Sequence, residues 1–372
     1  MSFMIQDRLE VALYFNDIEY SLKPGENTLN FLHMGASTRF RLPSIHLSVI
    51  DMLHSLDTLN LQDGLKIRVT IKRSQENTET YNFRKFNHQR SGQGGVFSYV
   101  MDGYLDFPQF WSGTSAASIN GTSGDALSKI ASTCGLKYDG ITTSDPQLWL
   151  QRNQTYSKFA RTIEASAYID DQSYMKWGVQ FDGTLTYRNL SNLGTATIKL
   201  VARQVQSDAL TVVDYAAATN SGLTNAVSGY NSTQQEQSML GESKSNASID
   251  FQSDSRSPMV STTVKEAAAH GDQSFAPLDF GNVHPKSARA VYQNQRYAGL
   301  LNTDVEFLFM EPTTMKLMQP FTFAADSQDL TQDAAFSGDY AISGQAIYIR
   351  GGDYFEKVVG TRHGTNLQYV AA

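Results

Sequence analysis

The sequence predicts a mainly β protein with an additional α+β part, divided into more than one domain. Short runs of β-branched and aromatic residues, separated by turn residues, recur over the first hundred positions and again after about residue 300. Helical spacing of apolar residues is concentrated in the middle of the chain. At 372 residues the chain is too long for one ordinary core, so two or three domains are expected.

Composition and charge narrow the class of protein. A hydrophobic fraction of 41% and a charged fraction of 18% suit a folded protein. The net charge of −7 argues against a nucleic-acid-binding surface, which needs clustered Lys and Arg. Cys134 is the one cysteine, so there is no disulfide framework. Asp7, Arg8 and Glu10 stand where a signal peptide would be apolar, and no run approaches the ~20 apolar residues of a membrane helix. We therefore expect a protein made in a cytoplasm, without a signal peptide and without membrane insertion.

The first region is predicted to form a β-barrel or sandwich. Residues 65–72 alternate cleanly, with Leu65, Ile67, Val69 and Ile71 on one face and charged residues on the other, as in a half-buried strand. Turn clusters are expected at residues 74–77 and 91–95. The expected strands are residues 9–15, 39–42, 45–50, 65–72, 81–86 and 97–100.

A capped helix is predicted shortly after Trp111. Ser123 is the expected N-cap, Asp125 complements the helix dipole, and Gly135 ends the helix. The apolar face comprises Ala126, Leu127, Ile130, Ala131 and Cys134. Cys134 is therefore expected to be a buried core thiol rather than a nucleophile.

A second helix and a hairpin complete the expected α+β unit. The helix covers about residues 156–167, is capped by Thr155 and buries Phe159, Ile163 and Ala167. Asp182-Gly183 marks a hairpin turn. A three-residue loop there would place five side chains on one face: Trp177, Val179, Phe181, Leu185 and Tyr187.

The last third combines a polar stretch with a second β region. Residues 214–262 bury little apolar surface and are expected to be loops and thin edge strands, followed by a helix at about 287–297. Strands are expected at 303–310, 318–324 and 340–349. Arg350-Gly351-Gly352-Asp353 is interpreted as a hairpin turn, because a strand-like run follows it and glycine reaches positive φ freely. An adhesion or ligand loop is the alternative. No sequence repeat between the two β regions is evident.

The sequence predicts no catalytic, cofactor-binding or metal-binding residues. It carries no nucleophile elbow, phosphate-binding loop or dinucleotide fingerprint. Asp170-Asp171 is the only adjacent acidic pair, and a solvated turn is the preferred interpretation. A carboxylate dyad formed by residues distant in the chain stays open. None of the histidines has metal-ligand spacing: His33, His46, His54, His88, His270, His284 and His363.

The order of these segments resembles that of bacteriophage tail hub proteins and the related hub half of type VI secretion spike proteins. Each match is loose, and the order of the matches along most of the chain carries the resemblance. The matching segments are the helix motif at 125–136, the helix beginning at Thr155 or Ser157, the hairpin at 181–188, and the C-terminal set formed by residues 337–342, Tyr354 and residues 361–364.

The resemblance implies a structural part with two tube-type β-barrels in each chain. Residues 1–110 would form the first barrel, and residues 209–230 with 302–372 the second. The peripheral α+β domain would take residues 111–208, continued by 231–301. A homotrimer would then form a pseudo-sixfold ring that joins a sixfold tail tube to a threefold central spike. DNA would pass through the lumen without specific binding, which the negative net charge fits.

The same resemblance implies partners and a location. The tail tube protein and a central spike protein are the expected partners, with tape measure and baseplate wedge proteins as further candidates, in the tail baseplate of a virion. Many relatives carry a fused spike, lysozyme or peptidase, whereas this chain stops at Ala372, so these parts are expected on separate chains.

Two alternatives stay open at this point. A receptor- or glycan-binding virion protein would require Trp111, Trp177, Tyr348 and Tyr354 to be exposed in a groove. A tail-associated hydrolase would require a pair of carboxylates in a cleft.

Overall fold

The computed structural model shows the expected mainly β fold. It describes residues 10–23, 26–38, 42–59, 61–72, 78–93, 96–170, 173–192, 194–202, 209–219, 234–237, 244–247, 303–325 and 336–362. The helix expected at about 287–297 and most of the polar stretch at 214–262 lie outside these residues. Within them, no helix combines the length and the hydropathy that crossing a membrane would require.

The N-terminal strands form an antiparallel sheet in the order β3-β4-β7-β6-β5-β1-β2. Burial alternates along β5, where Ile67, Val69 and Ile71 are fully buried, as expected. Ser91 and Gly92, expected in a turn, instead continue β6, because they pair with Ser98 and Phe97 of β7. The strands are β1 (Glu10–Phe15), β2 (Ile18–Tyr20), β3 (Thr28–Ser37), β4 (Ser44–Asp51), β5 (Lys66–Lys72), β6 (Thr78–Gln93) and β7 (Val96–Leu105).

The middle region packs α2 and α3 between small sheets, with β8 paired to β10 and the order β11-β12-β9 in the other. The N-cap of α2 is Thr122 rather than Ser123, because Thr122 forms a capping box with Asp125 while Ser123 donates its N–H to Asp145 at 2.9 Å. Gly135 ends α2 at φ 77°. The elements are α1 (Pro108–Trp111), β8 (Thr114–Gly121), α2 (Ser123–Cys134), β9 (Lys137–Gly140), β10 (Gln147–Thr155), α3 (Tyr156–Ser166), β11 (Met175–Val179) and β12 (Thr184–Asn189).

The C-terminal strands run in the order β14-β13-β19-β20-β21-β18-β15. Gly351 and Gly352 lie at φ 62° and 91° between β20 and β21, so the predicted hairpin is confirmed. The strands are β13 (Ile198–Ala202), β14 (Leu210–Val212), β15 (Asp214–Thr219), β18 (Thr303–Phe309), β19 (Pro320–Ala324), β20 (Gly338–Arg350) and β21 (Asp353–Arg362). Among the described strands, β16 (Gln234–Gln237) and β17 (Lys244–Ala247) pair only with each other.

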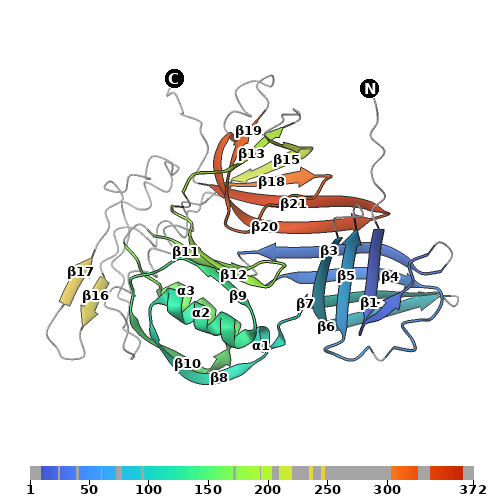
Figure 1. The fold of residues 1–372 in the computed structure, drawn as a ribbon, viewed down its shortest axis with the longest axis horizontal. Coiled ribbons are helices and arrows are strands. Elements are labelled where there is room, and N and C mark those ends of the chain that lie inside the picture. Colours follow the sequence, from blue (N-terminus) through green and yellow to red (C-terminus); the bar gives the residue numbers. More distant parts are fainter. Residues whose placement is uncertain are drawn as a thin grey trace.

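Strand β20 lies beside β3 and so joins the two large groups of strands into one continuous sheet (Figure 1). Two hydrophobic cores pack against this continuous sheet. One core spans the N-terminal sheet and the middle region and includes Phe83 and Trp177. The other fills the C-terminal sheet around Phe307 and Phe321, whose rings meet edge to face.

The two groups of strands contain the same five-stranded arrangement. In the N-terminal group the order is β3-β4-β7-β6-β5, and in the C-terminal group it is β15-β18-β21-β20-β19. All neighbours within both sets are antiparallel, and the chain visits the strands in the same sequence. We call this arrangement the five-stranded repeat.

Candidate functional site

The candidate functional site is the junction at which the two sheets and the middle region meet. Its backbone component is the pairing of β3 with β20, which runs from Ser37 opposite Gly344 to Phe31 opposite Arg350. Past the end of the pairing, Thr38 donates its N–H to the carbonyl of Ser343 at 2.9 Å. A continuous ladder of this kind fixes the two sheets as one unit.

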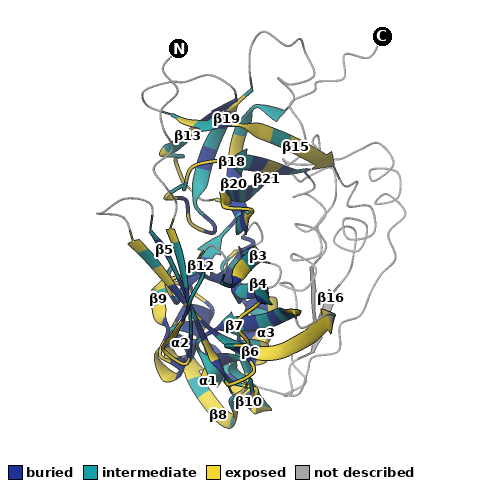
Figure 2. Ribbon diagram, turned by 90° about the vertical axis from the view of Figure 1, so that its right-hand side faces the viewer, coloured by how far each residue is buried: buried dark blue, intermediate teal, exposed yellow. Residues whose placement is uncertain are grey.

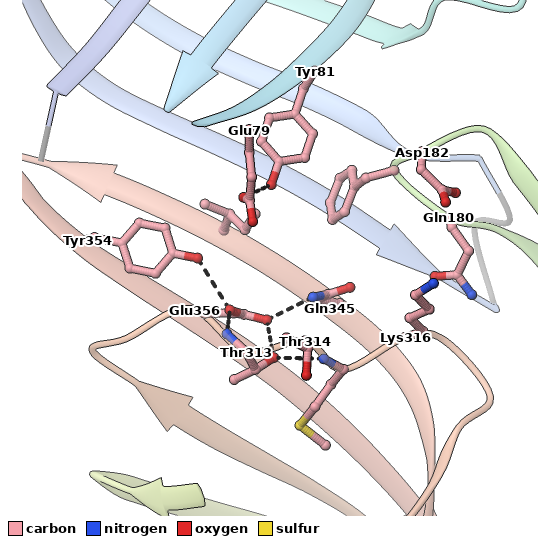
Figure 3. Close-up of a pocket in the computed structure, with 13 residues that line it drawn as sticks. Glu79, Tyr81, Gln180, Asp182, Thr313, Thr314, Lys316, Gln345, Tyr354 and Glu356 are labelled. Atoms are coloured by element: carbon pink, nitrogen blue, oxygen red, sulfur yellow. Dashed lines mark hydrogen bonds between the residues drawn. The ribbon is translucent and has the colours of Figure 1, made fainter. Parts of the chain in front are cut away.

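A pocket of about 180 Å³ lies at this junction (Figure 3). Its walls come from β6, the β11–β12 turn, the loop between β18 and β19, and the β20–β21 hairpin. The lining residues are Glu79, Tyr81, Gln180, Phe181, Asp182, Thr313, Thr314, Met315, Lys316, Gln345, Ile347, Tyr354 and Glu356.

Glu356 is the central buried charge of the junction, with 1% of its surface exposed. Its Oε1 accepts hydrogen bonds from Thr313 Oγ1 at 2.6 Å and Gln345 Nε2 at 2.7 Å. Its Oε2 accepts from Thr313 N at 2.6 Å and Tyr354 Oη at 3.2 Å. Four donors can hold a carboxylate in a buried place without a cation. Glu356 therefore fastens the β18–β19 loop to the sheet.

Gln180 fastens the same loop to the middle region. Its amide donates to the Leu317 carbonyl at 3.2 Å and accepts the Leu317 N–H at 3.1 Å. The same Nε2 also donates to Thr186 Oγ1 at 3.1 Å. All these groups are buried, so the side chain takes the place of a short piece of backbone pairing.

The half-buried face of the β3–β20 pairing carries aromatic and imidazole side chains. His33 stacks on Tyr348 with ring centroids 4.5 Å apart, and His46 Nδ1 lies 2.6 Å from Asp102 Oδ1. Burial, with smaller contributions from the nearby His46 and Lys357, lowers the pKa of His33 below its ordinary value of 6.5. His33 is therefore a titratable group that resists protonation at the junction.

The residues singled out in the sequence are not brought together into a chemical site. Cys134 is buried in α2, as expected, and burial raises the pKa of its thiol to about 12. Asp170 is exposed in a bend, and Asp171 lies outside the described residues. Among the residues that the structure describes, no three His, Cys, Asp or Glu side chains are grouped to hold a metal ion.

The aromatic groove required by the glycan-binding alternative is not formed by the residues named for it. Trp177 is fully buried and donates its indole N–H to the carbonyl of Ala160 at 3.1 Å. Tyr354 is buried beside Glu356, and Trp111 and Tyr348 are half-buried.

Sequence reasoning missed the roles of Glu356 and Gln180. Glu356 carried a usable signal, because it alternates along β21 with Tyr354 and Val358. Alternate residues of a strand lie on the same face, and Tyr354 and Val358 are both buried. Gln180 carried none, since its partners come from a loop 137 residues away.

Comparison with known proteins gives matches in structure alone. No protein-family model and no curated protein sequence matches the chain. A prophage MuSo2 43 kDa tail protein from Shewanella oneidensis matches 95% of this chain and 98% of its own, with a TM-score of 0.59 and 10% identity. A tail protein from Neisseria meningitidis matches 95% and 97%, with a TM-score of 0.60 and 11% identity. This chain has the fold of phage tail proteins.

Type VI secretion proteins share the fold too. The Escherichia coli c3393 protein, a component of the type VI secretion system with structural similarity to phage T4 tail proteins, has a TM-score of 0.50 at 8% identity. The match covers 95% of this chain and 77% of that one. A Francisella PdpA–VgrG complex gives 0.51 at 10% identity, covering 96% and 58%. The resemblance to tail hubs seen in the sequence is therefore confirmed at the level of the fold.

Proposed function

We propose that this chain is a structural hub of a phage tail baseplate. Three copies form a pseudo-sixfold ring that adapts the sixfold tail tube to a threefold central spike and leaves a channel for DNA. The observation that carries the proposal is the match in fold to two tail proteins over nearly the whole length of both chains. The tail tube and spike proteins are the proposed partners, and tape measure and wedge proteins are further candidates.

In this proposal each chain supplies two tube-type barrels. The first takes residues 1–110, the second residues 209–230 and 302–372, and the peripheral unit residues 111–208 with 231–301. Val213, between β14 and β15, donates its N–H to Leu308 at 2.9 Å, so this segment connects β13 on one side to β18 on the other. That connection supports the second barrel. Strand β13 pairs with β14 and β19, so we add residues 198–202 to it.

The role is structural rather than catalytic in this proposal. The comparison structures are tail and secretion-system proteins. The buried carboxylate of the junction pocket, Glu356, already accepts four hydrogen bonds from the chain itself. The net charge of −7 suits a wall past which DNA slides without binding.

Negative-stain images of the purified chain test this function. We expect threefold class averages of a ring with a central hole, whose six lobes alternate between two kinds. Compact particles without a hole would reject the hub. A screen of immobilised glycans on the same sample would then examine the receptor-binding alternative.

A further inference from the structure

The second half of β6 is an exposed strand edge. Strand β5 reaches only residues 78–84 of β6, and residues 87–93 of β6 continue past it beside β7. In the part of the chain that the structure describes, no strand pairs with their other edge. Residues 87–92 are all exposed (Figure 2). An edge this long and without proline is a template for pairing with another strand.

The five-stranded repeat identifies the counterpart of this edge. The β6–β7 and β20–β21 hairpins coincide residue by residue at a constant offset: Gly360 stands 257 positions after Gly103, and Arg350 stands 257 after Gln93. The register shift falls at the same place in both, after Lys85 in β6 and after its counterpart Ile342 in β20. The sequence pairs Gly94-Gly95 and Gly351-Gly352 keep the same offset.

The turns that lead into these hairpins agree as well. Gly64 donates its N–H to Lys85 O at 2.8 Å, and Met318 donates to Ile342 O at 2.7 Å. Gly64 and Met318 both have positive φ, at 86° and 63°. This agreement in hydrogen bonds and backbone conformation makes the equivalence more than a shared strand order.

The counterpart edge in the C-terminal copy is occupied. Beyond its register shift, residues 344–350 of β20 pair with β3, which is the first strand of the N-terminal copy. The first strand of the C-terminal copy is β15, and it pairs only with β18 among the described strands. Among its described strands, each chain therefore presents one complete joint, β20 paired with β3, and two strand edges that correspond to its halves but are not paired with each other, β6 and β15.

We propose that residues 87–93 of one subunit pair antiparallel with β15 of the next subunit, in the register that β20 and β3 use within the chain. Within the chain, Tyr348 lies opposite His33. The corresponding pair between subunits is Ser91 of one subunit opposite Ala216 of the next. The neighbouring pair, Ile347 opposite Met34, translates into Arg90 opposite Ala217. Gln93 falls opposite Asp214 by the same rule.

The side chains in this register are compatible. Residues 216–218 are all alanine and all exposed, so they offer no bulk against an approaching backbone. Residues 87–93 contain one Arg, Arg90, and no Lys, Asp or Glu. Strand β15 contains one charged residue, Asp214, so no like charges face each other.

This pairing closes a ring only if three chains form the proposed hub, so the inference rests on the proposed function. Each subunit carries one donor edge and one different acceptor edge, which makes the contact heterologous. Three such contacts would alternate with three internal β3–β20 joints. The result is a ring of six similar joints, which gives the trimer its pseudo-sixfold symmetry.

Paired cysteines test the register. Ser91→Cys combined with Ala216→Cys, and Arg90→Cys combined with Ala217→Cys, place thiols directly opposite each other, where Cα separations of about 4.5–5.5 Å suit a disulfide. Asn87→Cys with Ala216→Cys is the matched control, because four positions of misalignment separate the residues by roughly 13 Å. Each single variant checks for reaction with the buried Cys134. All are treated with diamide and run on non-reducing gels.

We expect at least one of the opposed pairs to give bands at two and three chain masses, while the control and the single variants stay at one. A trimeric wild-type ring in which neither opposed pair links, or in which only the control links, overturns the proposed edges and leaves the hub standing. A wild-type protein that is monomeric rejects the hub itself. The two failures are therefore distinguishable.

Discussion

Gln180 and Leu317 pair through two hydrogen bonds, an amide N–H to carbonyl at 3.2 Å and a backbone N–H to amide oxygen at 3.1 Å. Gln180→Ala removes both and leaves the backbone of Leu317 buried without its partner. We expect a loss of about 2–3 kcal/mol in the free energy of unfolding, measured by urea denaturation. Gln319→Ala is the control. The Gln319 side chain accepts a hydrogen bond from the exposed Lys316 N–H, so its loss should lower the free energy of unfolding by under about 1 kcal/mol.

Glu356→Gln tests the buried carboxylate. Each oxygen accepts two hydrogen bonds, so the amide NH2 would face two donors whichever way it turns. We expect a loss of about 1–3 kcal/mol in urea unfolding. The control is Glu306→Gln, whose side chain is exposed and whose partner Lys357 is partly exposed, with an expected change under about 0.5 kcal/mol. Equal effects from the two substitutions would contradict the role assigned to Glu356.

Gly360→Ala tests close packing at the repeated glycine. A Cβ at this position would lie 2.6 Å from Phe321 Cζ and 3.1 Å from Phe307 Cε2, both in a filled core. We expect overpacking to cost about 1–3 kcal/mol, seen as a lower Tm. Gly344→Ala is the matched control, because its nearest neighbour would be Val359 Cγ2 at an ordinary 3.4 Å. A Tm for Gly360→Ala at or above the wild-type value would contradict the packing argument.

Stability should fall as the pH drops below about 6.5 because of His33. Its pKa is lowered in the folded protein, so the unfolded chain binds a proton that the folded chain refuses. The groups that face it are His46, Lys357 and the ring of Tyr348. His33→Phe keeps the stacking ring and removes the titration. The difference in Tm between pH 7.5 and 5.5 should be smaller in this variant than in the wild type, and an unchanged difference would rule out His33 as a source.

The elements that the sequence predicted well are those with local signals. Helix α2 was marked by the helical spacing of its apolar face and a terminal Gly135, and the last hairpin by Gly351 and Gly352, because such positions are decided by neighbouring residues. The end of β6 was misread as a turn. Gly92 favours a turn, but pairing with β7 decides its conformation.

The junction could not be predicted in the same way. The β3–β20 pairing joins residues more than 300 positions apart, and no local pattern specifies such a partner. The repeat was missed because few identities remain, chiefly Gly103 with Gly360 and the Gly-Gly sequence pairs at 94–95 and 351–352. Core positions need only apolar residues of suitable size, so the other similarities have disappeared while the strand order is kept.

Light scattering on the purified chain tests the central claim most directly. A hub predicts a species of about 124 kDa, three times the chain mass of 41.2 kDa, across a wide range of concentration. A species at the mass of one chain or of two chains over the same range would contradict the trimeric ring.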